Sequence, residues 1–172
     1  MEAMEAIEKR RSVRSYQANQ IPEEDLKAIL LAGCAAPVGM RKYDTLHITV
    51  IQDQQILKRM SEMIKNQMKT EHDPLYHVPT VIVVFSKEPP MPGIDYVNAA
   101  CVMENMMIAA ADRGIGSVIL WGTALAVEAD QNVKAALKVP DGYKAIVGAG
   151  FGYAAGGSAE RTMEMTIDTN FI

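Results

Sequence analysis

The spacing of hydrophobic and polar residues divides the first half of the chain into helices and strands. The stretch IPEEDLKAILLAGCAAP has Pro22 and acidic residues in a first turn, apolar residues at helical spacing, and a stop at Pro37. Two short apolar runs, LHITVI at 46–51 and VPTVIVVF at 78–85, predict strands, and the second is continuous enough for a central strand covered on both faces. Helical composition or spacing predicts two more helices, at 2–10 and 53–70.

The second half begins with an unusually apolar segment, IDYVNAACVMENMMIAAADR at 94–113. Its interior carries one carboxylate, Glu104, and apolar residues surround it almost completely, so the predicted helix is buried in a core or in a subunit interface. Gly114 is in the position expected for a helix end. The remaining pattern predicts a strand at 117–121, a helix at 126–138, a glycine-containing strand in YKAIVGAGFGY and a polar tail from about 157 to 172.

These elements predict one α+β domain over residues 1–172, with roughly four strands and four or five helices. A chain of this size has a limited core in which to bury the apolar helix at 94–113. An obligate homodimer interface resembles a domain core cut in half, so we expect a homodimer built on this helix.

Composition restricts the partners. Hydrophobic residues make up 49% of the chain and charged residues 22%, as in an ordinary globular protein, and the formal net charge is −4. One local basic cluster in an acidic chain does not provide the broad basic face that nucleic acid requires. The beginning of the chain shows no apolar signal region, and its apolar runs are too short to cross a bilayer, so we expect a soluble cytoplasmic protein.

A basic cluster, EKRRSVRS, follows the first predicted helix. Arg10 and Arg14 are four residues apart with Ser12 between them. Guanidinium groups bind phosphate oxygens in pairs and a serine hydroxyl adds a neutral donor, so the cluster is a candidate phosphate site. The alternative is a set of solvated charges that complement a helix C-terminus.

Two glycine-containing segments are weaker candidates. In APVGM, Pro37 fixes the backbone and Gly39 permits a flat ligand or another chain to approach, but taken alone the segment is better explained as a simple turn into the next strand. GIGSVILWG lacks the strand and helix context of a dinucleotide fingerprint, so its glycines fit a helix cap and a strand end. Trp121, the sole tryptophan, is either core or interface filler or part of a site.

Other chemistry finds little support. We interpret Cys34 and Cys101 as reduced core residues, because no histidine near them in sequence is placed to activate a thiol. The three histidines show no metal-ligand spacing, and we predict no metal site.

Taken together, AIEKRRSVRSYQ, IPEEDLKAILLAGCAAPVG, the apolar helix NAACVMENMMIAAADRGIGSVILWG and IVGAGFGY with an arginine shortly after it resemble the nitroreductase family of FMN-dependent oxidoreductases. The resemblance implies a mixed sheet flanked by helices, a dimer formed through long central helices, and FMN at the subunit interface. It also implies that the polar tail packs on the partner.

The resemblance assigns residues to the cofactor by position. The FMN phosphate falls to Arg10, Ser12 and Arg14, to Arg11 less directly, and to Arg161 in the tail. Pro37, Val38 and Gly39 are assigned to the flavin from the other subunit. The backbone of Leu120, Trp121 and Gly122 is assigned to the ring, where an N–H can donate to flavin N5 or O4.

The sequence departs from the family after Pro37. Many members continue with a pattern such as S-G-G-N-x-Q-P-W, whereas this chain has VGMRKYDT, with Arg41 at the asparagine position. Met40 or Arg41 then takes over the missing polar contacts, and a cation near flavin N1 and O2 favours the anionic reduced form. The chain also lacks the long insertion that larger members fold over the active site, which predicts an open substrate pocket.

The activity implied by the resemblance is transfer of hydride from NAD(P)H through flavin N5 to a nitroaromatic, a quinone or free flavin, with ping-pong kinetics. The flavin carries the chemistry, so no side chain is assigned as a catalytic acid or base. Two alternatives stay open: a non-catalytic protein that stores or senses FMN, and a dimeric structural module whose basic cluster binds nothing.

Overall fold

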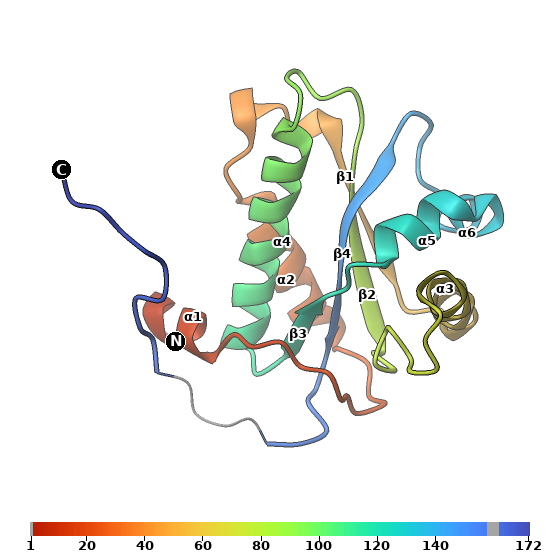
Figure 1. The fold of residues 1–172 in the computed structure, drawn as a ribbon, viewed down its shortest axis with the longest axis horizontal. Coiled ribbons are helices and arrows are strands. Elements are labelled where there is room, and N and C mark those ends of the chain that lie inside the picture. The colour runs from red at the N-terminus through yellow and green to blue at the C-terminus, as the bar shows by residue number, and fades with distance from the viewer. Residues whose placement is uncertain (1, 158–161) are drawn as a thin grey trace.

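The chain folds into a four-stranded sheet with helices on both faces (Figure 1). The computed structural model describes residues 2–157 and 162–172. The helices are α1 (Ala3–Lys9), α2 (Glu23–Cys34), α3 (Gln54–Met68), α4 (Ile94–Asp112), α5 (Thr123–Ala129) and α6 (Gln131–Ala136), with two short 3₁₀ turns, η1 (Gly39–Arg41) and η2 (Tyr43–Thr45). The strands are β1 (Leu46–Ile51), β2 (Thr80–Ser86), β3 (Gly116–Ile119) and β4 (Lys144–Gly152).

The sheet has the strand order β1-β2-β4-β3, and its three strand pairs are antiparallel. Every residue of β2 is buried, which confirms the prediction of a covered central strand. The family resemblance implies a sheet with both parallel and antiparallel pairs. In the described part of the chain, the parallel pairing is one isolated bridge between Ser12 and Ser117. β3 is therefore an edge strand, and its outer edge receives the N-terminal segment.

The alternation of β2 separates two hydrophobic layers. Val81, Val83 and Phe85 face one side with α3, α5 and α6, whereas Ile82 and Val84 face the other side with α2 and α4. Figure 1 shows α2 and α4 on one face of the sheet and α3, α5 and α6 on the other. Both faces of the sheet are thus covered, as the near-continuous apolar run predicts.

Helix α4 packs closely on α2 but leaves one side open. A Cβ atom at Gly33 would lie 2.8 Å from Met106 Cγ, so glycine permits the two helices to approach at this point. On the outer side of α4, Tyr96 is 65% exposed and Val97 57% exposed, and Ala100 is exposed beside them. The apolar helix therefore lies half in the core and half at the surface of the single chain.

Several sequence predictions need correction. The helix expected at 126–138 is two short helices, because the backbone becomes extended at Asp130, whose side chain accepts hydrogen bonds from the N–H groups of Asn132 and Val133 at the start of the second. The strand expected at 117–121 ends at Ile119, and the chain then turns. Cys34 is exposed and Cys101 half-buried, so Cys34 is not a core residue. Among the described residues, no helix has the length and apolar character needed to span a membrane.

Candidate functional site

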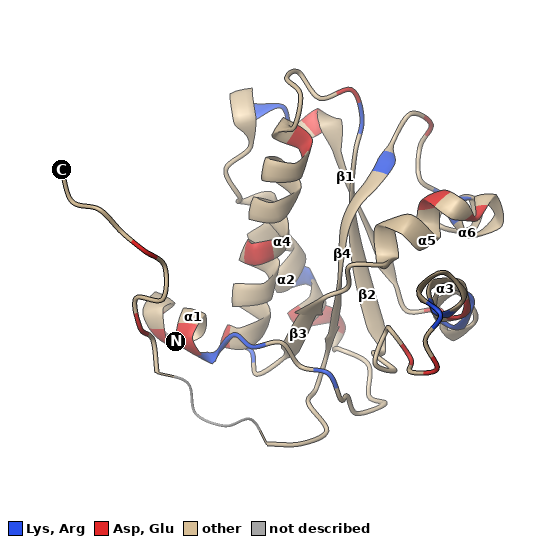
Figure 2. Ribbon diagram, in the orientation of Figure 1, with Lys and Arg blue, Asp and Glu red and all other residues tan. Residues whose placement is uncertain are grey.

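The basic segment after α1 lies along the open edge of β3. The Val13 N–H donates to the Ser117 carbonyl oxygen at 3.0 Å, and Ser12 forms its parallel bridge with the same residue. Helix α1 ends at Lys9, where the chain becomes extended at Arg10. Figure 2 shows this stretch as a blue segment running from the end of α1 toward β3. The fold therefore holds the segment on the sheet rather than leaving it as a free helix end.

Gly116 makes this close approach possible. A Cβ atom at Gly116 would lie 2.5 Å from Val13 Cγ2, a distance that real side chains do not reach. Glycine at the first residue of β3 thus admits the Val13 side chain, and Val13 in turn fixes the residues on either side of it. From the sequence, Gly116 was expected only to mark a strand end. Its role in the structure is to let the N-terminal segment approach β3, and a glycine at the start of a strand is the local signal for such a close approach.

The two arginines of the cluster have different surroundings. The Arg10 side chain is 21% exposed, and its Nε lies 3.6 Å from Glu104 Oε1 on α4. Arg14 and Ser12 are exposed, whereas Arg11 is half-buried. Burial raises the pKa of the nearby Tyr16 phenol well above its usual value, and the positive charge of Arg14 opposes that rise. The segment thus presents Ser12 and Arg14 to solvent, with Arg10 held against α4.

A tight turn follows β3 and leads into α5. The Leu120 N–H donates to the Gly148 carbonyl oxygen at 2.9 Å, and the Thr123 N–H donates back to the Leu120 carbonyl oxygen at 3.1 Å. The Thr123 hydroxyl donates to the same oxygen at 2.6 Å. Leu120 and Thr123 are buried, but Trp121 between them is 87% exposed, so it is not core filler in the single chain.

The basic segment and this turn lie on one edge of the sheet. Backbone groups alternate along an edge strand, and the Leu120 N–H is bonded to β4, so the backbone groups of Ser117 and Ile119 point to the open side. The edge thus carries cationic and hydroxyl groups at one end and outward backbone groups at the other, which fits a ligand with a phosphate and a flat polar ring.

The segment 37–41 is built as a fixed loop at the N-terminal end of α4. The Gly39 N–H donates to Oδ1 of Asn98, a buried residue of α4, at 2.9 Å. Met40 and Arg41 both have positive φ, 53° and 56°, a conformation that costs energy for residues other than glycine. Sequence reasoning missed Asn98, although a polar residue on the buried face of an apolar helix is a usable signal.

One chain does not bring all predicted residues together. Segment 37–41 lies at the N-terminal end of α4, whereas α1 and Arg10 lie against its C-terminal half (Figure 1). The segment that carries Arg10, Ser12 and Arg14 pairs with the edge of β3 at Ser117, and the turn of Leu120, Trp121 and Gly122 directly follows the same strand. Arg161 lies outside the described residues.

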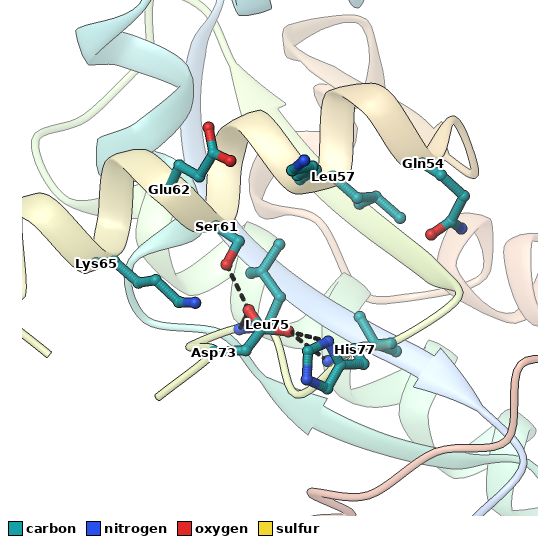
Figure 3. A pocket seen from close by; sticks show the side chains of 10 residues that line it. Gln54, Leu57, Ser61, Glu62, Lys65, Asp73, Leu75 and His77 are labelled. Carbon is teal, nitrogen blue, oxygen red and sulfur yellow. Dashed lines mark hydrogen bonds and ion pairs between the residues drawn. The ribbon is translucent and has the colours of Figure 1, made fainter. Parts of the chain in front are cut away.

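A cavity of about 340 Å³ between α3 and the loop at 73–78 is a separate hollow. Figure 3 shows Asp73, one of the lining residues, between Ser61 and His77. Asp73 Oδ1 accepts from the Ser61 hydroxyl at 2.5 Å and from the Leu75 N–H at 3.1 Å, and Oδ2 accepts from the His77 N–H at 2.6 Å. His77 Nδ1 lies 2.9 Å from the same Oδ2. Both carboxylate oxygens accept hydrogen bonds from the loop, and Oδ1 also from Ser61 of α3, so Asp73 is a structural residue that ties the loop to the helix.

Asp73 predicts a pH-dependent contribution to stability. Burial alone would raise the pKa of this carboxyl, but the hydrogen bonds from Ser61, His77 and Leu75 outweigh it and the pKa is lowered. A lowered folded-state pKa stabilises the fold above the unfolded value of about 3.9, and this stabilisation is lost as the pH falls through the folded-state pKa. Asp73→Asn is therefore expected to lower the free energy of unfolding by about 2 kcal/mol at pH 7.

Urea unfolding at several pH values measures this effect. The gap between wild type and Asp73→Asn should narrow below about pH 4, as the carboxylate of the wild type becomes protonated. Asp141→Asn, in an exposed turn, is the matched control and should change little. If the difference in free energy of unfolding between wild type and Asp73→Asn were the same at pH 7 and below about pH 4, the ionised Asp73 carboxylate would not be the source of the stabilisation.

No group of three histidine, cysteine, aspartate or glutamate residues in the described ranges is arranged to hold a metal ion.

Solved structures define the class of this fold. A nitroreductase from Bacteroides fragilis crystallised with bound FMN is 32% identical, with a TM-score of 0.84 over 100% of this chain and 98% of that one. A nitroreductase from Desulfitobacterium hafniense, also with bound FMN, has a TM-score of 0.87 at 21% identity, over 100% of this chain and 99% of that one, and supports the fold alone. The architecture is therefore the nitroreductase fold, as predicted.

The sequence comparisons identify the family. The model of the nitroreductase family matches residues 7–153, so the chain belongs to the nitroreductase family. A relative from Archaeoglobus fulgidus, provisionally named as an NADH dehydrogenase/NAD(P)H nitroreductase, is 33% identical over 123 residues, which are 69% of this chain and 67% of that protein. These findings confirm the family resemblance drawn from the basic segment, the AP segment and the apolar helix.

Proposed function

We propose that this protein is an FMN-dependent oxidoreductase that moves hydride from NAD(P)H to an acceptor such as a nitroaromatic or a quinone. The observation that carries the proposal is the basic segment paired onto the edge of β3, at a fixed distance from the turn at Leu120. The bound FMN of the 32% identical Bacteroides fragilis structure supports the same cofactor.

The residues that would hold FMN fall into two groups. Arg10, Ser12 and Arg14 would bind the phosphate, with Arg11 and Arg161 as further cations, because guanidinium groups and hydroxyls are strong phosphate donors. The turn of Leu120, Trp121 and Gly122 would lie beside the ring; the Leu120 N–H and carbonyl oxygen are already bonded within the fold, to Gly148 and Thr123. The second group is the fixed loop of Pro37, Val38, Gly39, Met40 and Arg41, in which the Gly39 N–H is held by Asn98.

The chemistry that FMN supplies when bound is acceptance and donation of hydride at N5. The chain's own residues position that atom: the phosphate cluster sets where the ligand lies along β3, and outward N–H groups polarise the ring. Arg41 is exposed and is presented by a loop with a positive φ at this residue. It would place a positive charge near the ring and favour the reduced anion. No side chain is required as an acid or base.

We propose a homodimer as the active form. The two cofactor-binding groups lie toward opposite ends of α4 in one chain, so a second copy packed on the outer face of α4 would supply the missing loop. That face carries the exposed apolar residues Tyr96 and Val97. The described tail 162–172 lacks helix or strand and exposes Ile167 and Phe171, which would pack on the partner.

Steady-state kinetics test the function. With NADH or NADPH varied against menadione or nitrofurazone, the purified protein loaded with FMN should give parallel double-reciprocal lines, because two reactants use one pocket in turn. A protein that binds FMN and shows no turnover above a free-FMN blank would instead store or sense flavin. A protein that fails to bind added FMN would contradict the proposal altogether.

A further inference from the structure

The basic segment is fixed a second time, beyond its contact with β3. Past Arg14, the chain pairs with the stretch that follows β4. The pairs are Ser15 with Ala155 and Gln17 with Tyr153, joined by backbone hydrogen bonds of 2.9 and 2.8 Å, and Tyr16 with Ala154 in an isolated antiparallel bridge. Arg14 therefore lies between two anchors, the hydrogen bond from Val13 to Ser117 on one side and this pairing on the other.

The Tyr16 side chain adds a packing contact to the second anchor. It is half-buried and packs against the hydrophobic layer on the α3 side of the sheet. A Cβ atom at Gly152 would lie 3.0 Å from Tyr16 Cδ1 and 2.8 Å from Pro79 Cδ, so glycine at the end of β4 gives the ring its place beside the proline. The ring thus holds residue 16, and with it Arg14 two residues earlier, at one position on the sheet.

The Tyr16 hydroxyl takes no part in this contact. Its oxygen is buried, and no group in the described part of the chain hydrogen-bonds to it. Burial raises the pKa of the phenol far above its usual value, and the charge of Arg14 opposes that rise, so the guanidinium group lies near enough to interact with the ring. A buried hydroxyl without a partner costs free energy, so any contribution of Tyr16 comes from its ring.

We propose that Tyr16 is a positioning residue that holds Arg14 at the phosphate end of the site and thereby strengthens the preference for FMN over riboflavin, the same flavin without a phosphate. The inference rests on the proposed function, which assigns Arg14 to the FMN phosphate. Arg14 is exposed, and an exposed arginine binds phosphate more tightly when its backbone is already fixed, because less freedom is lost on binding. The Tyr16 ring acts through Arg14 and does not touch the ligand.

Titrations of the flavin-free protein with FMN and with riboflavin, followed by flavin fluorescence, test the inference. In Tyr16→Ala, the dissociation constant of FMN should rise roughly tenfold and that of riboflavin should stay unchanged, since a charge-assisted contact is lost from the phosphate alone. Tyr16→Phe keeps the ring and should keep the wild-type ratio of the two constants. Tyr143→Ala, which removes a half-buried tyrosine just before β4 at the other end of that strand, is the matched control and should also keep the ratio.

A double variant shows whether Tyr16 acts through Arg14. Tyr16→Ala added to Arg14→Ala should weaken FMN binding no further than Arg14→Ala does, because the contact that Tyr16 positions is then already lost. If Tyr16→Ala does not fold, Tyr16→Leu takes its place in both experiments. Leucine keeps apolar volume without the flat ring, and this variant should also lower the preference for FMN.

The contrary results separate the inference from the proposed function. If the alanine or leucine variant weakens FMN and riboflavin binding equally, the ring is only part of the core and the inference is wrong. It is also wrong if Tyr16→Phe loses the preference for FMN, or if the losses in the double variant add. In each of these cases the wild type still binds FMN and the proposed function stands. If the wild type binds no FMN, the proposed function itself fails.

Discussion

Replacing Arg10 and Arg14 together by alanine is expected to give a folded protein that no longer retains FMN. The two guanidinium groups flank Ser12 on the edge of β3, where Val13 is fixed by its hydrogen bond to Ser117. Each lost hydrogen bond between a guanidinium and a phosphate should weaken binding roughly 10- to 100-fold, so the double variant should lose at least about 100-fold. Fluorescence titration with FMN measures the dissociation constant.

The neighbouring Lys9 provides a matched control. Its Nζ pairs with Glu5 Oε1 at 2.7 Å on the exposed side of α1, and such surface pairs contribute little. Lys9→Ala should therefore bind FMN like the wild type, and circular dichroism should show all variants folded. If the double arginine variant bound FMN as tightly as the wild type, Arg10 and Arg14 would not bind the FMN phosphate.

Replacing Val97 by glutamate is expected to separate the dimer and, with it, to reduce FMN binding. Val97 is 57% exposed on the outer face of α4, which we assign to the subunit interface. A carboxylate buried there without a partner costs several kcal/mol, enough to make the protein monomeric at micromolar concentration. Loss of the partner's loop at 37–41 should then weaken FMN binding by roughly 100-fold or more, since that loop is one of the two groups of residues proposed to hold FMN.

Sedimentation velocity and FMN titration on the same samples measure both effects. Met68→Glu is the control, because Met68 is 61% exposed on α3, on the other face of the sheet. It should leave the oligomeric state and the affinity unchanged. If the Val97→Glu protein stayed dimeric, the outer face of α4 would not be the subunit interface. If it became monomeric and kept its affinity for FMN, the site would not be shared between subunits.

Local sequence patterns predicted most of the elements because their causes are local. The apolar run that became β2 and the acidic first turn that begins α2 each depend on neighbouring residues. The division between α5 and α6 was missed at Asp130. In the sequence this aspartate resembles any polar residue on the surface of a helix, and only the structure shows that its side chain caps α6.

The site was less accessible to such reasoning because its parts meet over long sequence distances. Ser12 pairs with Ser117, and Gly39 with Asn98, through contacts that no local spacing encodes. The family resemblance supplied the basic segment and the turn at Leu120, whereas the fold supplied the reason that they belong together. The exposure of Trp121 could not be predicted, since an apolar residue at the end of an apolar run is expected to be buried.

The most direct test of the central claim is an anaerobic titration of the purified, FMN-loaded protein with NADH and with NADPH, followed at the visible absorbance of the flavin. We predict that at least one of them bleaches the flavin stoichiometrically, and that menadione or nitrofurazone then restores the colour. A protein that binds FMN but whose absorbance neither nicotinamide alters would contradict an oxidoreductase and leave a flavin-binding role.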